Sequence, residues 1–193
     1  MSQLCRQGYP VLPGLVVDST CYASAVMAAC NCDPSLAELW RQSEAGSIGE
    51  DCSLQQQAIM ARQAMEAASV AEQATAVAVA LSKALMAWPT TTLVLRPSFS
   101  FPGAERQPLL NLLAARPARR DRLEEIAAGV QQLWSEIFTG QGLFYWRKLG
   151  VPVASLRLAI LVQPLLTTEI AGQVHANSER WEIETIAGLG QSL

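Results

Sequence analysis

The chain lacks a long apolar run, a recognisable secretory leader and an excess of basic charge. Its first residues show no basic flank followed by a continuous apolar segment, so we expect no signal peptide. The longest apolar run, residues 74–88, is interrupted by Ser82 and Lys83 and is shorter than the roughly 20 residues of a membrane-spanning helix. A net charge of -3 gives no basic field for nucleic acid or for an anionic membrane. We therefore expect a cytoplasmic protein without nucleic-acid or membrane partners.

Metal-binding and redox motifs are also scarce. The chain has one histidine, His175, and five cysteines, all in its first third and none at C-x-x-C spacing: Cys5, Cys21, Cys30, Cys32 and Cys52. An odd number of cysteines without a secretory signal predicts reduced thiols. Cys30-Asn31-Cys32 has no second pair to complete a metal site, so we expect these cysteines to be small buried side chains.

The strongest pattern in the chain is an alternating apolar strand near residues 156–163. Its even-numbered residues up to Val162 are apolar and share one face, while Ala159 and Leu161 keep the other face largely apolar. The strand is therefore expected to be covered on both sides. The polar Gln163 at its end, directly before Pro164, either caps a turn or opens into a ligand site.

The remaining segments alternate between helical and strand patterns, which predicts an α+β fold. With 193 residues and 50% hydrophobic content, the chain is long enough to bury a sizeable core. We expect an N-terminal lobe at residues 1–90 and a second lobe at residues 91–193. In the first lobe we expect a Pro-Gly turn and a strand within 8–20, helices at 21–29 (capped by Ser19 or Thr20) and 36–40, and two helices within 54–88 separated near Ser69. In the second lobe we expect a strand at 91–96, an irregular stretch at 104–120 with a short helix at 109–115, and a helix from Asp121 to Gly140. A helix at 141–149 ended by Gly150 and a hairpin of 169–176 with 181–186 complete the expected elements.

Two groups of arginines invite a phosphate interpretation. Arg96 closes the strand at residues 91–96, where its planar fork of donors suits phosphate, although a surface arginine paired with a carboxylate is the simpler alternative. The cluster within residues 116–122 is diluted by Asp121 and by the glutamates that follow it. We expect this cluster to be the solvated entrance to a helix.

Five short motifs stand in order across almost the whole chain. They are GYPVLPGLVV at 8–17, LRPS at 95–98, LWSEIFT at 133–139 with FYWR at 144–147, AILVQPLL at 159–166 and AGLGQ at 187–191. In that order they resemble the G-x-P-V-P-P-G-F-V-I, V-R-S-S, W-A-S-L-F-T, A-x-x-V-Q-x-M-V and W-G-L-G-E strings of one family. The family is the N-terminal ATP-grasp domain of phosphoenolpyruvate synthase and pyruvate phosphate dikinase, which is also seen in rifampin phosphotransferase.

This resemblance implies an ATP-grasp-like mixed sheet flanked by helices and an ATP-dependent phosphotransferase of the pyruvate, water dikinase type. It places Arg96 where the family's arginine holds ATP phosphates. It places Gln163, Pro164 and Leu165 at the hinge that lines the adenine pocket, where backbone groups read the base edge and apolar side chains sandwich the ring. The implied cofactor is ATP.

The chain departs from the family where phosphoryl transfer needs charge. The family's Gly-Gly-Lys loop is absent, and a shorter proline-rich stretch replaces the glycine-rich lid after Ser98. Gln191 stands in place of the metal-binding carboxylate, so a Mg²⁺ site is not expected. His175 lacks the sequence context of a phosphoryl carrier.

These departures predict a nucleotide-binding chain that is catalytically incomplete alone, with no catalytic or metal-ligating residue. The acceptor substrate stays open. The alternatives are a non-catalytic interaction module, whose former cleft or aromatics at residues 144–146 contact a protein partner that supplies missing elements, and a fragment of a larger enzyme.

Overall fold

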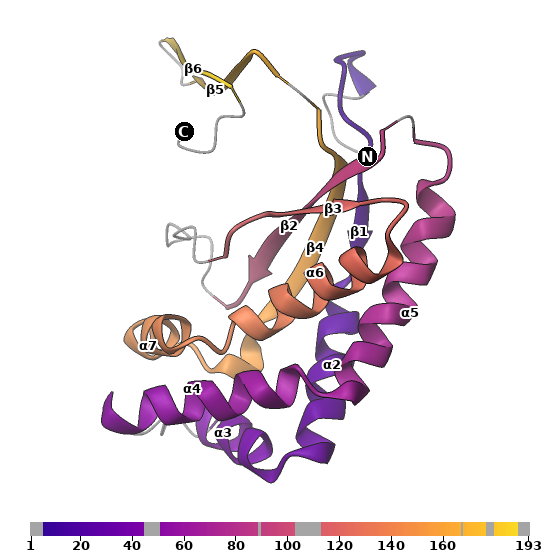
Figure 1. Cartoon of the computed structure of the whole chain (residues 1–193). Helices are drawn as coiled ribbons and strands as arrows, with labels where there is room; N and C mark the ends of the chain where they lie inside the picture. The colour runs from indigo at the N-terminus through magenta and orange to yellow at the C-terminus, as the bar shows by residue number, and fades with distance from the viewer. Residues whose placement is uncertain are drawn as a thin grey trace.

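The α+β class is confirmed by the computed structural model, which describes residues 6–44, 51–88, 90–102, 113–166, 168–176 and 180–188. Helices and strands follow one another along the chain, and the strands form two separate sheets (Figure 1). The elements are β1 (Leu15–Val17), α2 (Ser19–Cys32), α3 (Pro34–Glu44), α4 (Asp51–Met65), α5 (Ala68–Leu85), β2 (Thr92–Ser100), β3 (Arg116–Arg119), α6 (Leu123–Glu136), α7 (Gly140–Lys148), the 3₁₀ turn η2 (Val153–Ser155), β4 (Arg157–Pro164), β5 (Ile170–Ala176) and β6 (Trp181–Ala187).

The main sheet has the strand order β1-β4-β2-β3, and each of its three strand pairs is antiparallel. Its longest ladder joins β2 to β4, from Leu93 opposite Pro164 to Ser100 opposite Arg157. Strand β1 comes from the expected lobe at 1–90, yet it pairs with β4 of the expected lobe at 91–193. The two expected lobes therefore share one sheet.

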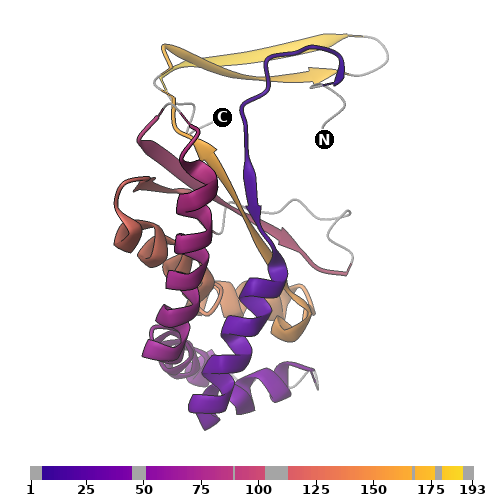
Figure 2. The same ribbon diagram turned by 90° about the vertical axis from the view of Figure 1, so that its right-hand side faces the viewer.

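The helices cover one face of this sheet. Helix α2 packs on β4 and helix α6 packs on β2 and β3, while α2 and α5 run side by side (Figure 2). Leu158, Ile160 and Val162 of β4 are fully buried in this layer. On the other face Arg157 is exposed, and the odd-numbered residues up to Gln163 are only partly buried. The sequence predicted cover on both sides, and the strand is fully covered on one face and only partly on the other.

Helix α6 begins at Leu123, two residues after Asp121, where the sequence predicted its start. Its N-cap residue is Arg122, whose side chain has no acceptor and makes no capping hydrogen bond. The carboxylate of Asp121, one residue earlier, accepts hydrogen bonds from the side chain of Arg119. The helix ends at Glu136, and Gly140 starts α7 instead of ending α6. The expected cap of α2 at Ser19 or Thr20 is wrong, because Asp18 is the N-cap residue and its carboxylate accepts a hydrogen bond from the N–H of Thr20.

Other expected boundaries are close to the structure. Helices α4 and α5 separate at residues 66–67, two residues before the expected break. Gly150 follows α7 with a positive φ of 64°, a conformation that glycine adopts at little cost, so its predicted role as a terminator is confirmed. Strand β3 lies in the stretch expected to be irregular. The expected helix at 109–115 falls mostly outside the described residues.

The second sheet is the predicted hairpin of β5 and β6. It lies at the end of the molecule opposite to α3 and α4, and β4 leads into it (Figures 1 and 2). The N–H of Gly188 donates to the carbonyl of Glu169 (2.8 Å), and the Thr168 hydroxyl donates to the carbonyl of Gly188 (3.2 Å), so the base of the hairpin is tied together. Every residue of β6 is exposed.

Candidate functional site on the open sheet face

Arg96 and Gln163 lie on the same face of the main sheet, the one that the helices leave open. Arg96 is opposite Leu161 in the β2–β4 ladder, and Val94 is opposite Gln163. Residues that are opposite in an antiparallel ladder point to the same face, and diagonal neighbours have Cβ atoms roughly 7–8 Å apart. The structure therefore brings together two of the four residues that the sequence assigned to a nucleotide site.

The other two assigned residues point elsewhere. Pro164 is buried and pairs with Leu93 on the helix-covered face. Leu165 is half-buried, and its N–H donates to the carbonyl of Thr92 at 2.9 Å. Because this hydrogen bond extends the β2–β4 ladder, the Leu165 N–H is already engaged and is not a free donor for a base edge.

The centre of the open face is an apolar platform. Val16 of β1 and Arg96 of β2 flank Leu161 on either side, so the three form one row across the sheet. Val94 in the next row is only 7% exposed although it lies outside the main core. The partly buried Leu161 thus provides the apolar surface between Arg96 and Gln163, whereas Val94 is covered and offers almost none.

The segment before β1 borders this platform. A Cβ atom placed on Gly14 would lie 3.0 Å from Cδ1 of Leu161 and 3.6 Å from Cγ of Gln163. The Pro-Gly entry of the chain is therefore packed against the very residues of β4 that form the proposed site. Two of the sequence motifs, residues 8–17 and 159–166, meet at this point.

Arg96 is exposed and has no ion-pair partner among the residues that the structure describes. The sequence-level alternative, a surface arginine held by a carboxylate, thus finds no support in the described part of the chain. A guanidinium without a carboxylate partner keeps its full set of donors for an anion.

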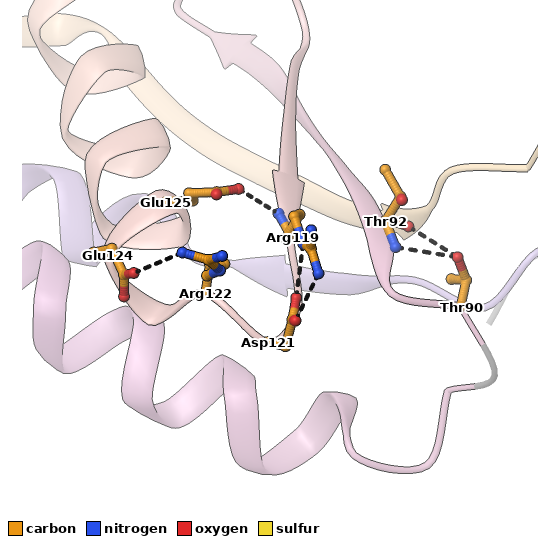
Figure 3. Close-up of polar contacts among 7 residues, drawn as sticks. All are labelled: Thr90, Thr92, Arg119, Asp121, Arg122, Glu124 and Glu125. Atoms are coloured by element: carbon orange, nitrogen blue, oxygen red, sulfur yellow. Dashed lines mark hydrogen bonds and ion pairs between the residues drawn. The ribbon is translucent and has the colours of Figure 1, made fainter.

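Arg116, Arg119 and Arg122 differ from Arg96 because each lies near a carboxylate, and Figure 3 shows the last two. Arg120 instead donates to the backbone carbonyls of Leu85 and Trp88. The Arg119 guanidinium donates to both carboxylate oxygens of Asp121, with distances of 3.0 and 2.8 Å, and its backbone N–H donates to Glu125 (3.1 Å). Arg116 pairs with Glu136 of α6. Arg119 and Arg122 therefore lie at the entrance to α6, as expected, whereas Arg116 pairs with the last residue of that helix.

Arg157 is a residue of this face that the sequence analysis did not single out. It is exposed, begins β4 and is opposite Ser100 in the ladder. Its position could have been inferred from the same alternation that placed Leu161 and Gln163, because it is an odd-numbered residue of the same strand.

A separate hollow lies between α4 and the start of α7. It has a volume of about 620 Å³ and is lined by residues such as Gln55, Arg62, Glu66 and Gln141. It does not include Arg96 or Gln163. Arg62 is within 3.6 Å of Glu66, so the hollow offers no unbalanced charge.

The expected aromatic surface at residues 144–146 is only partly present. Phe144 is 51% exposed, but Trp146 is 1% exposed and packs edge-on against Phe99 and Phe101. The expectation of an exposed aromatic cluster is therefore wrong for Trp146, which belongs to the core.

Within the described ranges no group of three or more His, Cys, Asp or Glu side chains is arranged to hold a metal ion. Cys21 and Cys30 are partly buried against the core, whereas Cys32 is exposed. His175 is in β5, and its side chain, like Gln191, lies outside what the structure describes.

The fold and this face define an α+β protein with an open antiparallel sheet that carries an arginine without a carboxylate partner in the described chain. A scan against models of known protein families and a search of curated proteins both gave no match. No described helix is both long and apolar enough to cross a bilayer.

Proposed function

We propose that this chain binds an adenine nucleotide, ATP or a close relative, on the open face of its main sheet. The observation that carries this proposal is the diagonal placement of Arg96 and Gln163 around Leu161. Arginine donates in a planar fork that matches phosphate oxygens. The Gln163 amide offers both a donor and an acceptor to a base edge, and Leu161 offers an apolar surface to its ring.

The five motifs that resemble the ATP-grasp domain of phosphoenolpyruvate synthase support adenine as the base. The neutral Gln191, which stands in place of the family's metal-binding carboxylate, favours binding without phosphoryl transfer, since such transfer depends on cations around the phosphates. We accordingly assign no catalytic residue and no Mg²⁺ ligand. The odd number of cysteines supports a cytoplasmic location.

A second candidate function is contact with a protein partner through the β5–β6 hairpin. Ile170, Trp181 and Ile183 share one face of this hairpin and are 68%, 75% and 67% exposed. Two-stranded sheets are marginally stable alone, and exposed apolar surface of this kind is typical of interaction sites. This candidate is compatible with nucleotide binding on the other sheet.

Calorimetric titration with ATP, with and without Mg²⁺, tests the first proposal. We expect saturable binding that Arg96→Ala weakens by about 1 to 3 kcal/mol, or roughly 5- to 150-fold in Kd. Arg41→Ala, which removes an exposed arginine from α3, is the matched control and should bind like the wild type. If the wild-type chain gives no binding heat, or if both variants bind equally well, Arg96 does not hold a nucleotide.

A further inference from the structure

The open sheet face continues beyond Arg96 as a row of polar side chains. Ser98 and Ser100 follow Arg96 at alternate positions of β2, so all three point to this face, and all three are exposed. Across the ladder Ser98 is opposite Ala159, and Ser100 is opposite Arg157. The row thus begins and ends with an arginine.

The two arginines are separated by a fixed stretch of ladder. Arg157 lies four residues before Leu161, the residue opposite Arg96, which corresponds to about 13 Å along the strand. The Arg157 guanidinium is held back toward Ala154 and Leu156, so only the Arg96 side chain can lean over Ser98 and Ser100. The gap that remains is on the scale of a chain of linked phosphates. A single phosphate group is too small to bridge them.

The Arg157 guanidinium is oriented by the backbone before it. Its Nη1 donates to the carbonyls of Ala154 and Leu156, both at 3.2 Å. Arginine has five N–H donors, so the fork formed by Nε and Nη2 is left, and no partner for it is found among the described residues. That fork is the edge that binds two oxygens of a phosphate at once.

The charge of the row is not cancelled by a carboxylate within the described part of the sheet. The carboxylate that follows β1, that of Asp18, accepts the Thr20 N–H at 2.8 Å and so serves the first turn of α2. The described strands β1, β2 and β4 contain no aspartate or glutamate.

We propose that Ser98, Ser100 and Arg157 form an anion-binding row continuous with Arg96, so that the face selects ligands that carry two or three linked phosphates over monophosphates. This inference rests on the proposed nucleotide site and names its ligand class. Arg157 binds the far end of the phosphate chain, and the two serine hydroxyls donate to the oxygens between the arginines.

Titration with AMP, ADP, ATP and inorganic tripolyphosphate tests this inference. For the wild-type chain we expect affinity to rise with each added phosphate. Arg157→Gln should lower ATP and tripolyphosphate affinity on the order of tenfold or more and leave AMP affinity within about twofold. Arg157→Lys keeps the charge but loses the planar fork of donors, so its affinity for ATP and tripolyphosphate should lie between those of the wild type and Arg157→Gln.

The controls separate this inference from the proposal beneath it. Arg41→Gln removes the same charge on α3 and should bind every ligand like the wild type, and circular dichroism should show that each variant is folded. Equal losses for AMP and ATP in Arg157→Gln, or no loss at all, would overturn the phosphate row. Tripolyphosphate binding without any preference for adenine nucleotides would overturn the nucleotide site and support the row, and an absence of binding by all four ligands would overturn both.

Discussion

Gly129 of α6 and Leu95 of β2 are in direct contact where the helix crosses the sheet. A Cβ atom placed on Gly129 would lie only 2.6 Å from Cδ1 of Leu95, and the Leu95 side chain is fully buried. The missing side chain at residue 129 therefore sets how closely α6 approaches the strand that carries Arg96. The packing of α6 on the covered face therefore bears directly on the strand that presents Arg96 on the open face.

Gly129→Ala should destabilise the fold in spite of the better helix propensity of alanine. The gain in propensity is at most about 1 kcal/mol, whereas overpacking a well-filled core costs about 1 to 3 kcal/mol. We expect a net loss of about 1 kcal/mol in the free energy of unfolding, measured by urea denaturation.

A double-mutant cycle with Leu95→Val identifies the cause of this loss. Valine is one carbon shorter and makes room for the new methyl group, so the two changes should cost less together than the sum of their separate effects. Strict additivity would mean that the close contact between Gly129 and Leu95 does not limit the packing.

The Tyr22 side chain gives the stability of the fold a dependence on alkaline pH. Its hydroxyl is buried without a hydrogen-bond partner among the described residues. Burial raises the pKa of Tyr22 well above 10, the nearby Cys30 raises it further, and the charge of Arg157 offsets part of the effect. Above about pH 10 the unfolded chain releases this proton and the folded chain keeps it.

The free energy of unfolding should therefore be unaffected by Tyr22 below pH 10 and should fall above it by up to about 1.4 kcal/mol per pH unit. Tyr22→Phe removes this contribution, so its stability should decline less steeply between pH 10 and 11. At pH 7 the variant should be as stable as the wild type or more stable, because an unpaired buried hydroxyl is lost. Parallel urea titrations across this range measure both effects, and identical slopes for the two proteins would contradict the assignment.

Trp146 should be among the most costly side chains to truncate. It is 1% exposed and lies between 5.3 and 6.0 Å, centre to centre, from the rings of Phe99, Phe101 and Tyr145. Trp146→Ala should lower the free energy of unfolding by about 3 to 5 kcal/mol. Phe144→Ala removes a half-exposed ring two residues away and should change stability by no more than about 0.5 kcal/mol. Similar losses for the two variants would contradict the burial of Trp146.

The sequence predicted the strands in which apolar residues stand out in a local pattern of their own. Strand β4 was recognised from an alternation that starts at Leu156, and three of its apolar residues, Leu158, Ile160 and Val162, lie in the strand. Strand β3 was missed because Arg-Pro-Ala-Arg has no such pattern. Its Pro117 is tolerated only because β3 is an edge strand, paired on one side with β2, and that position is known only from the tertiary structure.

The geometry of the candidate site could not be predicted from the sequence. Sequence motifs pointed to Arg96 and Gln163, but their common face depends on the register between β2 and β4, which no local pattern encodes. The same register placed Pro164 on the covered face. Arg157 was not predicted because ligands are expected at the carboxyl ends of strands, and Arg157 begins β4.

The hairpin offers the last prediction, because Trp181 is exposed on a face that it shares with Ile183. Trp181→Ser should leave the free energy of unfolding within about 0.5 kcal/mol of the wild type, since the side chain is 75% exposed and buries little on folding. If the apolar face is a contact surface, the same substitution should reduce binding of a hydrophobic dye and retention on a hydrophobic column.

The control is Trp88→Ser, in the turn after α5, because Trp88 is partly buried and packs against the core. This variant should have a lower free energy of unfolding than the wild type. A large stability loss in Trp181→Ser would mean that the hairpin face is already covered within the folded chain, which would remove the basis for a protein partner at this end of the molecule.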